Sequence, residues 1–375
     1  MLDIDDSRLL TPSLLGELGA IATRAALLDQ DDSFPSEDVA ALAAIGTLAA
    51  PFASLPGGGV ARNPDDLMEA LRAIGHASLP LGRLFEGHVN AAALIRRYGT
   101  SRQRESALRR ARDGALFGVW NTEGADGVRL VRRGRHLELH GAKIFASGAG
   151  HVACPLITAR DEEGGLFMVL PRLDGSSRAD LSAWKAHGMR ASASGAFCFT
   201  GLRVEPDDML GQPGDYHRQP HFSAGAWRFC AVQLGGIDRL VDEAASYLRR
   251  HGRDTDPHQR ARMGEAMIAA ETARLWVERA ARIAEAEEAA TDERAAANAV
   301  AYVNLARCAV ERCGLQVMEL VQRSIGLSAF HRTSPVERLC RDLSTYLRQP
   351  APDRALYEGA AHVLAQEPPM RELWR

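Results

Sequence analysis

Beyond Gly225 the apolar residues of this chain recur at steps of three and four, which is the spacing of one face of an α-helix. Helices that carry a single apolar stripe must bury it against one another, so the pattern predicts an antiparallel four-helix bundle over residues 223–375. The acidic run Glu285–Glu288 is interpreted as a solvated helix end. The stripes comprise Ile237, Val241, Ala244 and Leu248; Met263, Met267, Ala270, Ala273 and Val277; and Ala299, Val303, Ala306, Val310, Cys313, Val317 and Leu320.

The rest of the chain divides into a helical and a strand-forming region. Residues 1–115 are rich in Ala and Leu with helical periodicity and predict an N-terminal α-helical domain, interrupted by a turn at Leu55–Val60. Over residues 116–222 short apolar runs such as Leu166–Leu170 are bounded by Gly, Pro or Asp, which predicts a compact β-barrel or sandwich. The expected class is therefore α+β multidomain.

Composition excludes several kinds of protein. A chain of 375 residues with 46% hydrophobic residues can bury more than one core, and a net charge of -3 does not favour a general nucleic-acid binder. Six scattered cysteines without a C-x-x-C pair or a suitably spaced His predict buried thiols and no metal site. The acidic start Met1–Asp6 lacks an apolar signal region, and no apolar run approaches the ~20 residues that span a bilayer. We expect a cytoplasmic protein.

A predicted hairpin runs from Trp120 to Ser147, with a turn at Arg133–Arg135 and a small-residue loop at each end. Small residues allow a flat ligand to approach the backbone. Thr122 and Ser147 offer hydroxyl groups, and Phe145 or Trp120 can stack on a ring. A planar heteroaromatic cofactor fits this arrangement, and ordinary turn chemistry is the alternative.

Several motifs resemble those of acyl-CoA dehydrogenases. Thr122-Glu123 resembles the Thr-Glu of that family's first flavin loop, Leu139–Ser147 resembles its L-N-G-x-K-x-W-I-T, and Pro335–Asp342 resembles its P-V-E-K-L-x-R-D. The family's order of helical domain, β domain and helical bundle also matches. The resemblance implies bound FAD, with Phe145 beside the flavin ring and the Ser147 hydroxyl at its N5 region.

Flavin binding in that family is shared between subunits, so the resemblance also implies a homodimer or homotetramer. Gln322 and Gly326 fall in a segment similar to Q-x-x-G-G-x-G-F, where Leu327 and Ala329 replace glycines and changed contacts to the adenine side are expected. The family's phosphate-binding Arg aligns with Leu248. Arg249, one residue later, is the candidate clamp, and a solvent-facing Arg is the alternative.

The resemblance does not supply a catalytic base. The two positions at which family members place their catalytic Glu are occupied here by Pro350 and Trp227. Asp353 is the substitute candidate, ahead of Tyr346 and His331. Glu358, within Tyr357-Glu358-Gly359, lies past the register of the motif and is interpreted as a coincidence.

The leading hypothesis is an FAD-dependent oxidoreductase acting on the CH–CH bond of an acyl-CoA or carrier-bound acyl thioester, with an undefined electron acceptor. One alternative is a flavin-dependent monooxygenase on the same fold, because reduced flavin activates oxygen and needs no Glu base. Another alternative is a non-catalytic module that binds an acyl carrier.

Overall fold

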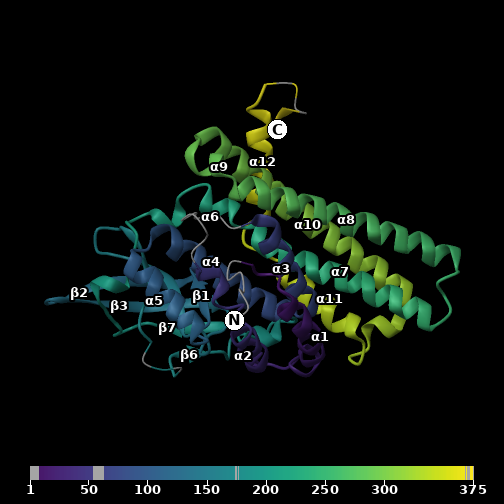
Figure 1. Cartoon of the computed structure of the whole chain (residues 1–375), viewed down its shortest axis with the longest axis horizontal. Coiled ribbons are helices and arrows are strands. Elements are labelled where there is room, and N and C mark those ends of the chain that lie inside the picture. The colour runs from purple at the N-terminus through teal and green to yellow at the C-terminus, as the bar shows by residue number, and fades with distance from the viewer. Residues whose placement is uncertain are drawn as a thin grey trace.

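The computed structural model describes residues 8–53, 63–173, 175, 177–367, 369 and 372–374. The predicted turn at Leu55–Val60 and the acidic start Met1–Asp6 lie outside them. Helices, then strands, then helices follow one another along the chain, with the strands at one end of the molecule and the long C-terminal helices at the other (Figure 1). The predicted class, helical domain, β domain and helical domain, is confirmed.

The N-terminal helices begin at well-capped positions. Side chains of Thr11, Asn63, Ser78 and Thr100 each accept a hydrogen bond from a backbone N–H in the first turn that follows, which satisfies an otherwise unpaired donor. Most residues of α4 are buried, and it packs on both β1 and α7, so it lies between the sheet and the C-terminal helices. The helices are α1 (Pro12–Leu27), α2 (Ser36–Ala44), α3 (Pro64–Ala77), α4 (Leu79–Tyr98) and α5 (Ser101–Arg112), with a 3-10 turn η1 (Ala50–Phe52).

The middle region forms one mixed sheet in the order β6-β7-β3-β2-β4-β5-β9, with β1 also paired to β4 and β8 to β3. Its end strands β6 and β9 do not pair among the described residues, so the expectation of a closed barrel or a two-sheet sandwich is wrong. The strands are β1 (Phe117–Trp120), β2 (Glu123–Arg133), β3 (His136–Ala146), β4 (Cys154–Arg160), β5 (Leu166–Val169), β6 (Ala179–Asp180), β7 (Gly195–Cys198), β8 (Arg203–Val204) and β9 (Met209–Leu210).

The predicted hairpin is β2 and β3, but both strands are longer than the alternation of residues indicates. The small-residue segments at its ends are themselves strand: Glu123 pairs with Lys143, and a register shift separates this pair from Val128 opposite Gly141. Ala142 and Lys143 pair in turn with β7. Much of the two expected loops is therefore irregular strand, while Asn121-Thr122 lie outside the strands and a turn begins at Ser147.

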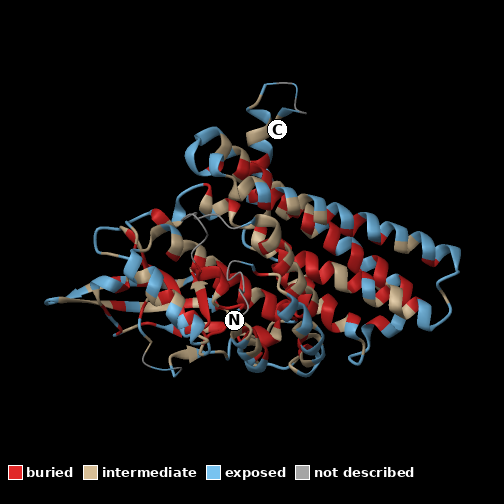
Figure 2. Ribbon diagram, viewed as in Figure 1, coloured by how far each residue is buried: buried red, intermediate tan, exposed pale blue. Residues whose placement is uncertain are grey.

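The C-terminal helices bury the predicted apolar stripes between them, as the red inner faces of α7, α8 and α10 show (Figure 2). Met267 is the exception, because 52% of it is exposed on the outer face of α8. α10 packs along both α7 and α8, and α11 closes on α7. The helices are α6 (His221–Ala224), α7 (Trp227–Arg250), α8 (Pro257–Glu285), α9 (Glu287–Thr291), α10 (Glu293–Ile325), α11 (Pro335–Tyr346) and α12 (Pro352–Leu364), with a 3-10 turn η6 (Gly326–Phe330).

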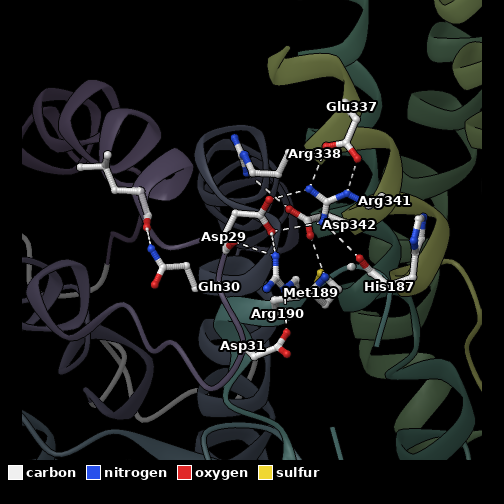
Figure 3. A network of polar contacts seen from close by, with 12 residues as sticks. Asp29, Gln30, Asp31, His187, Met189, Arg190, Glu337, Arg338, Arg341 and Asp342 are labelled. Carbon is white, nitrogen blue, oxygen red and sulfur yellow. Dashed lines mark hydrogen bonds and ion pairs between the residues drawn. The ribbon is translucent and has the colours of Figure 1, made fainter. Parts of the chain in front are cut away.

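A polar network joins all three regions (Figure 3). Arg341 of α11 donates to Asp29 Oδ2 at 2.5 Å and to Glu337 Oε1 at 2.6 Å. The buried carboxylate of Asp342 accepts a hydrogen bond from the backbone N–H of Met189 at 2.6 Å. Because Asp29 follows α1, Met189 belongs to the β domain and Asp342 to α11, this network, which we call the clasp, fixes the sheet against both helical regions.

Two absences hold for the described part of the chain. It contains no helix long and apolar enough to cross a membrane. It also contains no group of three or more His, Cys, Asp or Glu side chains placed to hold a metal ion. All six cysteines have free thiols.

Candidate functional site

Trp120 and Ser147 meet at the ends of two separate strands. Trp120 closes β1, and its indole Nε1–H donates to the backbone oxygen of Ser147, just after β3, at 2.9 Å. The indole is 3% exposed and packs on the rings of Phe197 and Phe199. Ser194 Oγ lies 3.3 Å from Ser147 Oγ. The pair is therefore held rigidly, with a partly exposed hydroxyl at its surface.

Thr122 is fixed beside the same strand by a buried lysine. The backbone N–H of Ile144 donates to Thr122 O at 3.0 Å. Lys143 Nζ, 0% exposed, donates to Asn121 O at 3.3 Å, to Glu123 Oε1 at 3.0 Å and to Thr158 Oγ1 at 2.9 Å. Burial lowers the pKa of Lys143, and Glu123 opposes that change. The lysine thus holds the residues on both sides of Thr122. Thr122 itself is exposed on the surface.

Phe145 presents an aromatic ring to solvent near these hydroxyls. It is 61% exposed, has a left-handed backbone with φ of +53°, and meets Trp184 edge-on at 6.4 Å between ring centroids. A left-handed phenylalanine is sterically costly and is found where the surrounding structure imposes it. An exposed ring beside exposed hydroxyls is a surface suited to a planar heteroaromatic group.

A cavity of about 1310 Å³ lies beside this site. One face of α4 forms a wall, and Val119, directly before Trp120, belongs to the lining. The other walls come from α6, the first residues of α7, the end of α8, the first half of α10, and α12 with the turn before it. Its lining combines apolar side chains with charged ones, including Glu86, Asn90, Arg96, Arg97, His221, Arg228, Glu285, Arg307 and Arg354.

The carboxylates of Glu86 and Glu285 in this cavity are bound to other side chains. Glu86 is paired with Arg83 and accepts from the Asn90 amide, whose oxygen accepts from Arg228 at 3.2 Å. Glu285 accepts from Arg228 at 2.5 Å and from the Trp227 indole at 3.1 Å. Burial acts to raise the pKa of Glu285, but Arg228 and the two hydrogen bonds outweigh it and keep the pKa below its ordinary value.

The interpretation of the acidic run as a solvated helix end is wrong for Glu285. Its side chain is 19% exposed and lies against Arg228, while Glu287 and Glu288 are exposed as expected. The signal that could have revealed it is its place at the C-terminal end of α8, where the helix dipole disfavours a negative charge and a cationic partner is required. No comparable feature of the sequence indicates the ion pair between Arg83 and Glu86.

The proposed substitute bases do not converge on the cavity. Pro350 lines it, whereas Asp353 is exposed in the first turn of α12 and is not part of the lining. His331 is exposed, and Tyr346 is buried below Arg83 and Glu86. Glu358 does line the cavity but is paired with Arg354 at 2.7 Å. Trp227 is fully buried and serves as a donor to Glu285.

Arg249, Gln322 and Gly326 lie together at the other end of the bundle. Arg249 is exposed in the last turn of α7, and Gly326 ends α10 with φ of +79°. Arg228 lines the cavity at the start of α7, and Arg249 lies 21 residues later in the same helix. At 1.5 Å per residue, Arg249 is about 32 Å from Arg228 along the helix axis. The structure therefore separates these three residues from the cavity of their own chain.

The sequence of this chain resembles those of known flavin-dependent enzymes. Residues 19–115 match the family model of the acyl-CoA dehydrogenase N-terminal domain, and residues 218–347 match that of the C-terminal domain. The chain is similar to a probable FMNH2-dependent monooxygenase, SfnC, from Pseudomonas putida, with 27% identity over 59% of this chain and 60% of the relative. It is also similar to glutaryl-CoA dehydrogenase from Desulfococcus multivorans, with 26% identity over 66% of this chain and 64% of the relative.

The segments that align with this chain cover less than two thirds of the length of SfnC and of the glutaryl-CoA dehydrogenase. Among solved structures, the FMN-bound dibenzothiophene monooxygenase TdsC from Paenibacillus sp. A11-2 has the same fold, with a TM-score of 0.82 at 20% identity over 96% of this chain and all of that one. The two domain models together cover more than half of the sequence. This chain belongs to the acyl-CoA dehydrogenase family.

Proposed function

We propose that this protein is a flavin-dependent monooxygenase that uses reduced FMN. The observation that carries the proposal is the state of the cavity carboxylates. Among the acids that line the cavity, Glu86, Glu285 and Glu358 are each paired with an arginine, whereas Glu287 and Glu293 are exposed to solvent. Neither family position for the catalytic Glu holds an acid. The similarity to monooxygenases in sequence and fold supports the same choice.

Dehydrogenation of an acyl thioester makes a demand that these residues do not meet. The α-proton must pass to a positioned base whose pKa suits the task. An ion pair with arginine lowers the basicity of a carboxylate and also restrains its position. Reduced flavin, when bound, supplies the electrons that activate dioxygen, so a monooxygenase needs no such base.

The residues at Trp120 and Ser147 fit a flavin ring. Phe145 offers an exposed aromatic face, and Thr122 and Ser147 offer hydroxyls next to the end of β3. Lys143 and the Trp120 indole hold the two backbone segments in place. The adjoining cavity, with α4 as one wall, offers space for a substrate next to this site.

FMN is favoured over the FAD expected from the motifs. The family's phosphate-binding Arg is replaced by Leu248, which is 2% exposed and packed in the bundle. Leu327, in the place of a family glycine, is 77% exposed, within the segment that the resemblance assigns to the adenine side. FMN lacks the adenylate and needs neither contact. SfnC is named for FMNH2 and TdsC was solved with FMN.

The dehydrogenase reading is the second candidate, favoured by the glutaryl-CoA dehydrogenase similarity. The two functions separate in one experiment on purified protein loaded with oxidised FMN. Under anaerobic conditions we expect glutaryl-CoA and butyryl-CoA to leave the flavin absorbance unchanged, whereas a dehydrogenase bleaches it. Loading with FAD in parallel checks the cofactor, and we expect FMN to bind at least tenfold more tightly. Tighter binding of FAD together with bleaching would contradict the proposal.

We further propose that the protein is a homodimer or homotetramer. Met267, Ile268 and Leu275 are 52%, 69% and 53% exposed along the outer face of α8, which is an apolar surface of the kind that subunit interfaces cover. Arg249, Gln322 and Gly326 can reach a flavin only on another copy, because they lie far from the cavity of their own chain.

A further inference from the structure

A buried amide without a hydrogen-bond partner lies in the wall of the cavity. Asn304, in the first half of α10, is 3% exposed, and its side chain makes no hydrogen bond with any residue that the structure describes. We infer that Asn304 selects the substrate, which is an uncharged and largely apolar molecule whose polar group forms hydrogen bonds with this amide. The inference rests on the proposed function and names its substrate class.

An unpaired amide in the interior is costly for the folded protein. Such a group loses its contacts with bulk water, at a cost of about 1–3 kcal/mol, unless another polar group replaces them. The amide of Asn304 is not sealed by packing, so a molecule in the cavity can reach both its oxygen and its nitrogen. Because this side chain both donates and accepts, it is complementary to an amide, a lactam or a similar neutral group.

The surroundings of Asn304 in the cavity are apolar. Ala301, Val300 and Ala297 precede it on α10 by three, four and seven residues, which is the spacing of one helix face, and all three line the cavity. Phe229 of α7 belongs to another wall. These side chains offer no hydrogen bond, so they suit the apolar body of a molecule whose polar group meets Asn304.

The charged side chains of the cavity leave no net charge for an ionic substrate. Within the described part of the chain, five arginines and five glutamates line the cavity, and no lysine or aspartate does. Three of these glutamates are bound in ion pairs, which are Glu86–Arg83, Glu285–Arg228 and Glu358–Arg354.

Two further arginines of the lining are also engaged. Arg307 donates to Pro350 O at 2.7 Å, and its guanidinium lies 5.3 Å from the centre of the Phe229 ring. Arg96 interacts with the carboxylate of Glu285. Neither arginine therefore offers an uncompensated charge to a ligand.

The remaining ionisable groups of the lining do not bind an ion either. Arg97, Glu287 and Glu293 are exposed, so water and salt screen their charges. His221 is neutral, because burial first and then Arg97 lower its pKa to about 4. A charged substrate loses its hydration here without gaining a counter-charge, whereas an uncharged one has less hydration to lose.

Three probes of the same shape test the substrate class. They are 2-naphthamide, 2-naphthoate and 2-isopropenylnaphthalene, which carry an amide, a carboxylate and no hydrogen-bonding group. Equilibrium dialysis of the FMN-loaded protein gives the three affinities. We expect the amide to bind at least tenfold more tightly than the carboxylate. Equal or tighter binding of the carboxylate, or no binding of the amide, would overturn the inference.

Asn304→Leu tests the residue itself. Leucine is similar in size, and no hydrogen bond within the protein is lost, so the free energy of unfolding should not fall. We expect the affinity for 2-naphthamide to decrease at least fivefold, while that for 2-isopropenylnaphthalene stays the same or increases. Gln316→Leu replaces an amide by leucine at an exposed position of the same helix and should change neither affinity.

Unchanged affinity for the amide in Asn304→Leu, or equal losses for the amide and the hydrocarbon, would show that Asn304 does not select the substrate. Dialysis of flavin-free protein in parallel separates this inference from the proposed function. Failure to bind FMN contradicts the monooxygenase proposal, while the preference for the amide stands or falls by its own measurement.

Discussion

Glu285 shows what a local sequence can and cannot reveal about a single residue. Its neighbours Glu287 and Glu288 are exposed, so the acidic run has the composition of a solvated helix end. The partners of Glu285, Trp227 and Arg228, precede it by 58 and 57 residues. Only the packing of α7 against α8 brings them together, and no short motif records that packing.

Glu285→Gln tests the assignment of this ion pair. The substitution keeps the shape but leaves Arg228, which is 12% exposed, without its charged partner. Because both groups are partly screened by solvent, we expect a loss of about 2 kcal/mol in the free energy of unfolding. Glu287→Gln, two residues later and exposed, should change it by less than about 0.5 kcal/mol. Urea unfolding of both variants makes the measurement, and equal effects would restore the solvated interpretation.

Trp120, Thr122 and Ser147 stay predictions, each made from a fixed place in a motif that can be recognised in the sequence. Ser147→Ala removes the hydroxyl but keeps the backbone oxygen that accepts from Trp120. We expect FMN affinity to fall about tenfold, the value of about one hydrogen bond, with little change in stability. Ser101→Ala, at an exposed helix start, is the control in a fluorescence-quenching titration. Unchanged FMN affinity in Ser147→Ala would remove this hydroxyl from the site.

At the scale of elements, prediction succeeds where the pattern is local. The alternation of residues and the Arg133–Arg135 turn predict the hairpin of β2 and β3, and both are present. The full length of β3 depends on pairing with β7, about 50 residues later, and so escapes a local pattern. The open sheet was missed for the same reason, because barrel closure is decided by which distant strands pair.

The clasp couples the elements, and Asp342 makes it sensitive to pH. Burial raises the pKa of Asp342 to about 6, against the opposing effects of Arg338 and the Met189 N–H. A folded-state pKa above the unfolded value of 3.8 contributes stability that is complete at low pH and is lost as pH rises through 6. Relative to Asp342→Asn, the natural protein should therefore lose about 1 kcal/mol of unfolding free energy between pH 5 and pH 7.5.

Urea unfolding at the two pH values measures this difference. Asp31→Asn is the matched control from the same network. The hydrogen bond from Arg190 and nearby positive charge lower the pKa of Asp31, so its carboxylate stays ionised throughout that range. The difference in unfolding free energy between the natural protein and Asp31→Asn should be the same at both pH values. A constant difference for Asp342→Asn would show that Asp342 does not titrate in this window.

For the whole molecule, the order of the three regions could be predicted because the hydrophobic period changes from that of helices to that of strands and back again. The cavity could not, since its walls come from α4, α6, α7, α8, α10, and α12 with the turn before it, and only the assembled fold defines them. Arg249 likewise appears as a candidate in the sequence, but its distance from the cavity is visible only in the structure.

Ile268→Asp tests the oligomer. Placing a charge on the apolar outer face of α8 should lower the molecular mass in solution by breaking a subunit contact, and it should leave the helical content unchanged because Ile268 is 69% exposed. Leu27→Asp makes the same change at a 72% exposed position of α1 and should leave the mass unchanged. Light scattering after gel filtration gives both masses. An unchanged mass in Ile268→Asp would exclude the outer face of α8 as a subunit interface.

The reaction of the reduced protein with oxygen tests the central claim most directly. Protein loaded with reduced FMN is mixed rapidly with oxygenated buffer, and the return of oxidised flavin absorbance is followed in time beside that of free reduced FMN. A monooxygenase site that shields the ring should slow reoxidation at least tenfold, and Ser147→Ala should accelerate it again. Reoxidation as fast as that of free FMN, combined with bleaching of the oxidised protein by an acyl-CoA, would contradict the account.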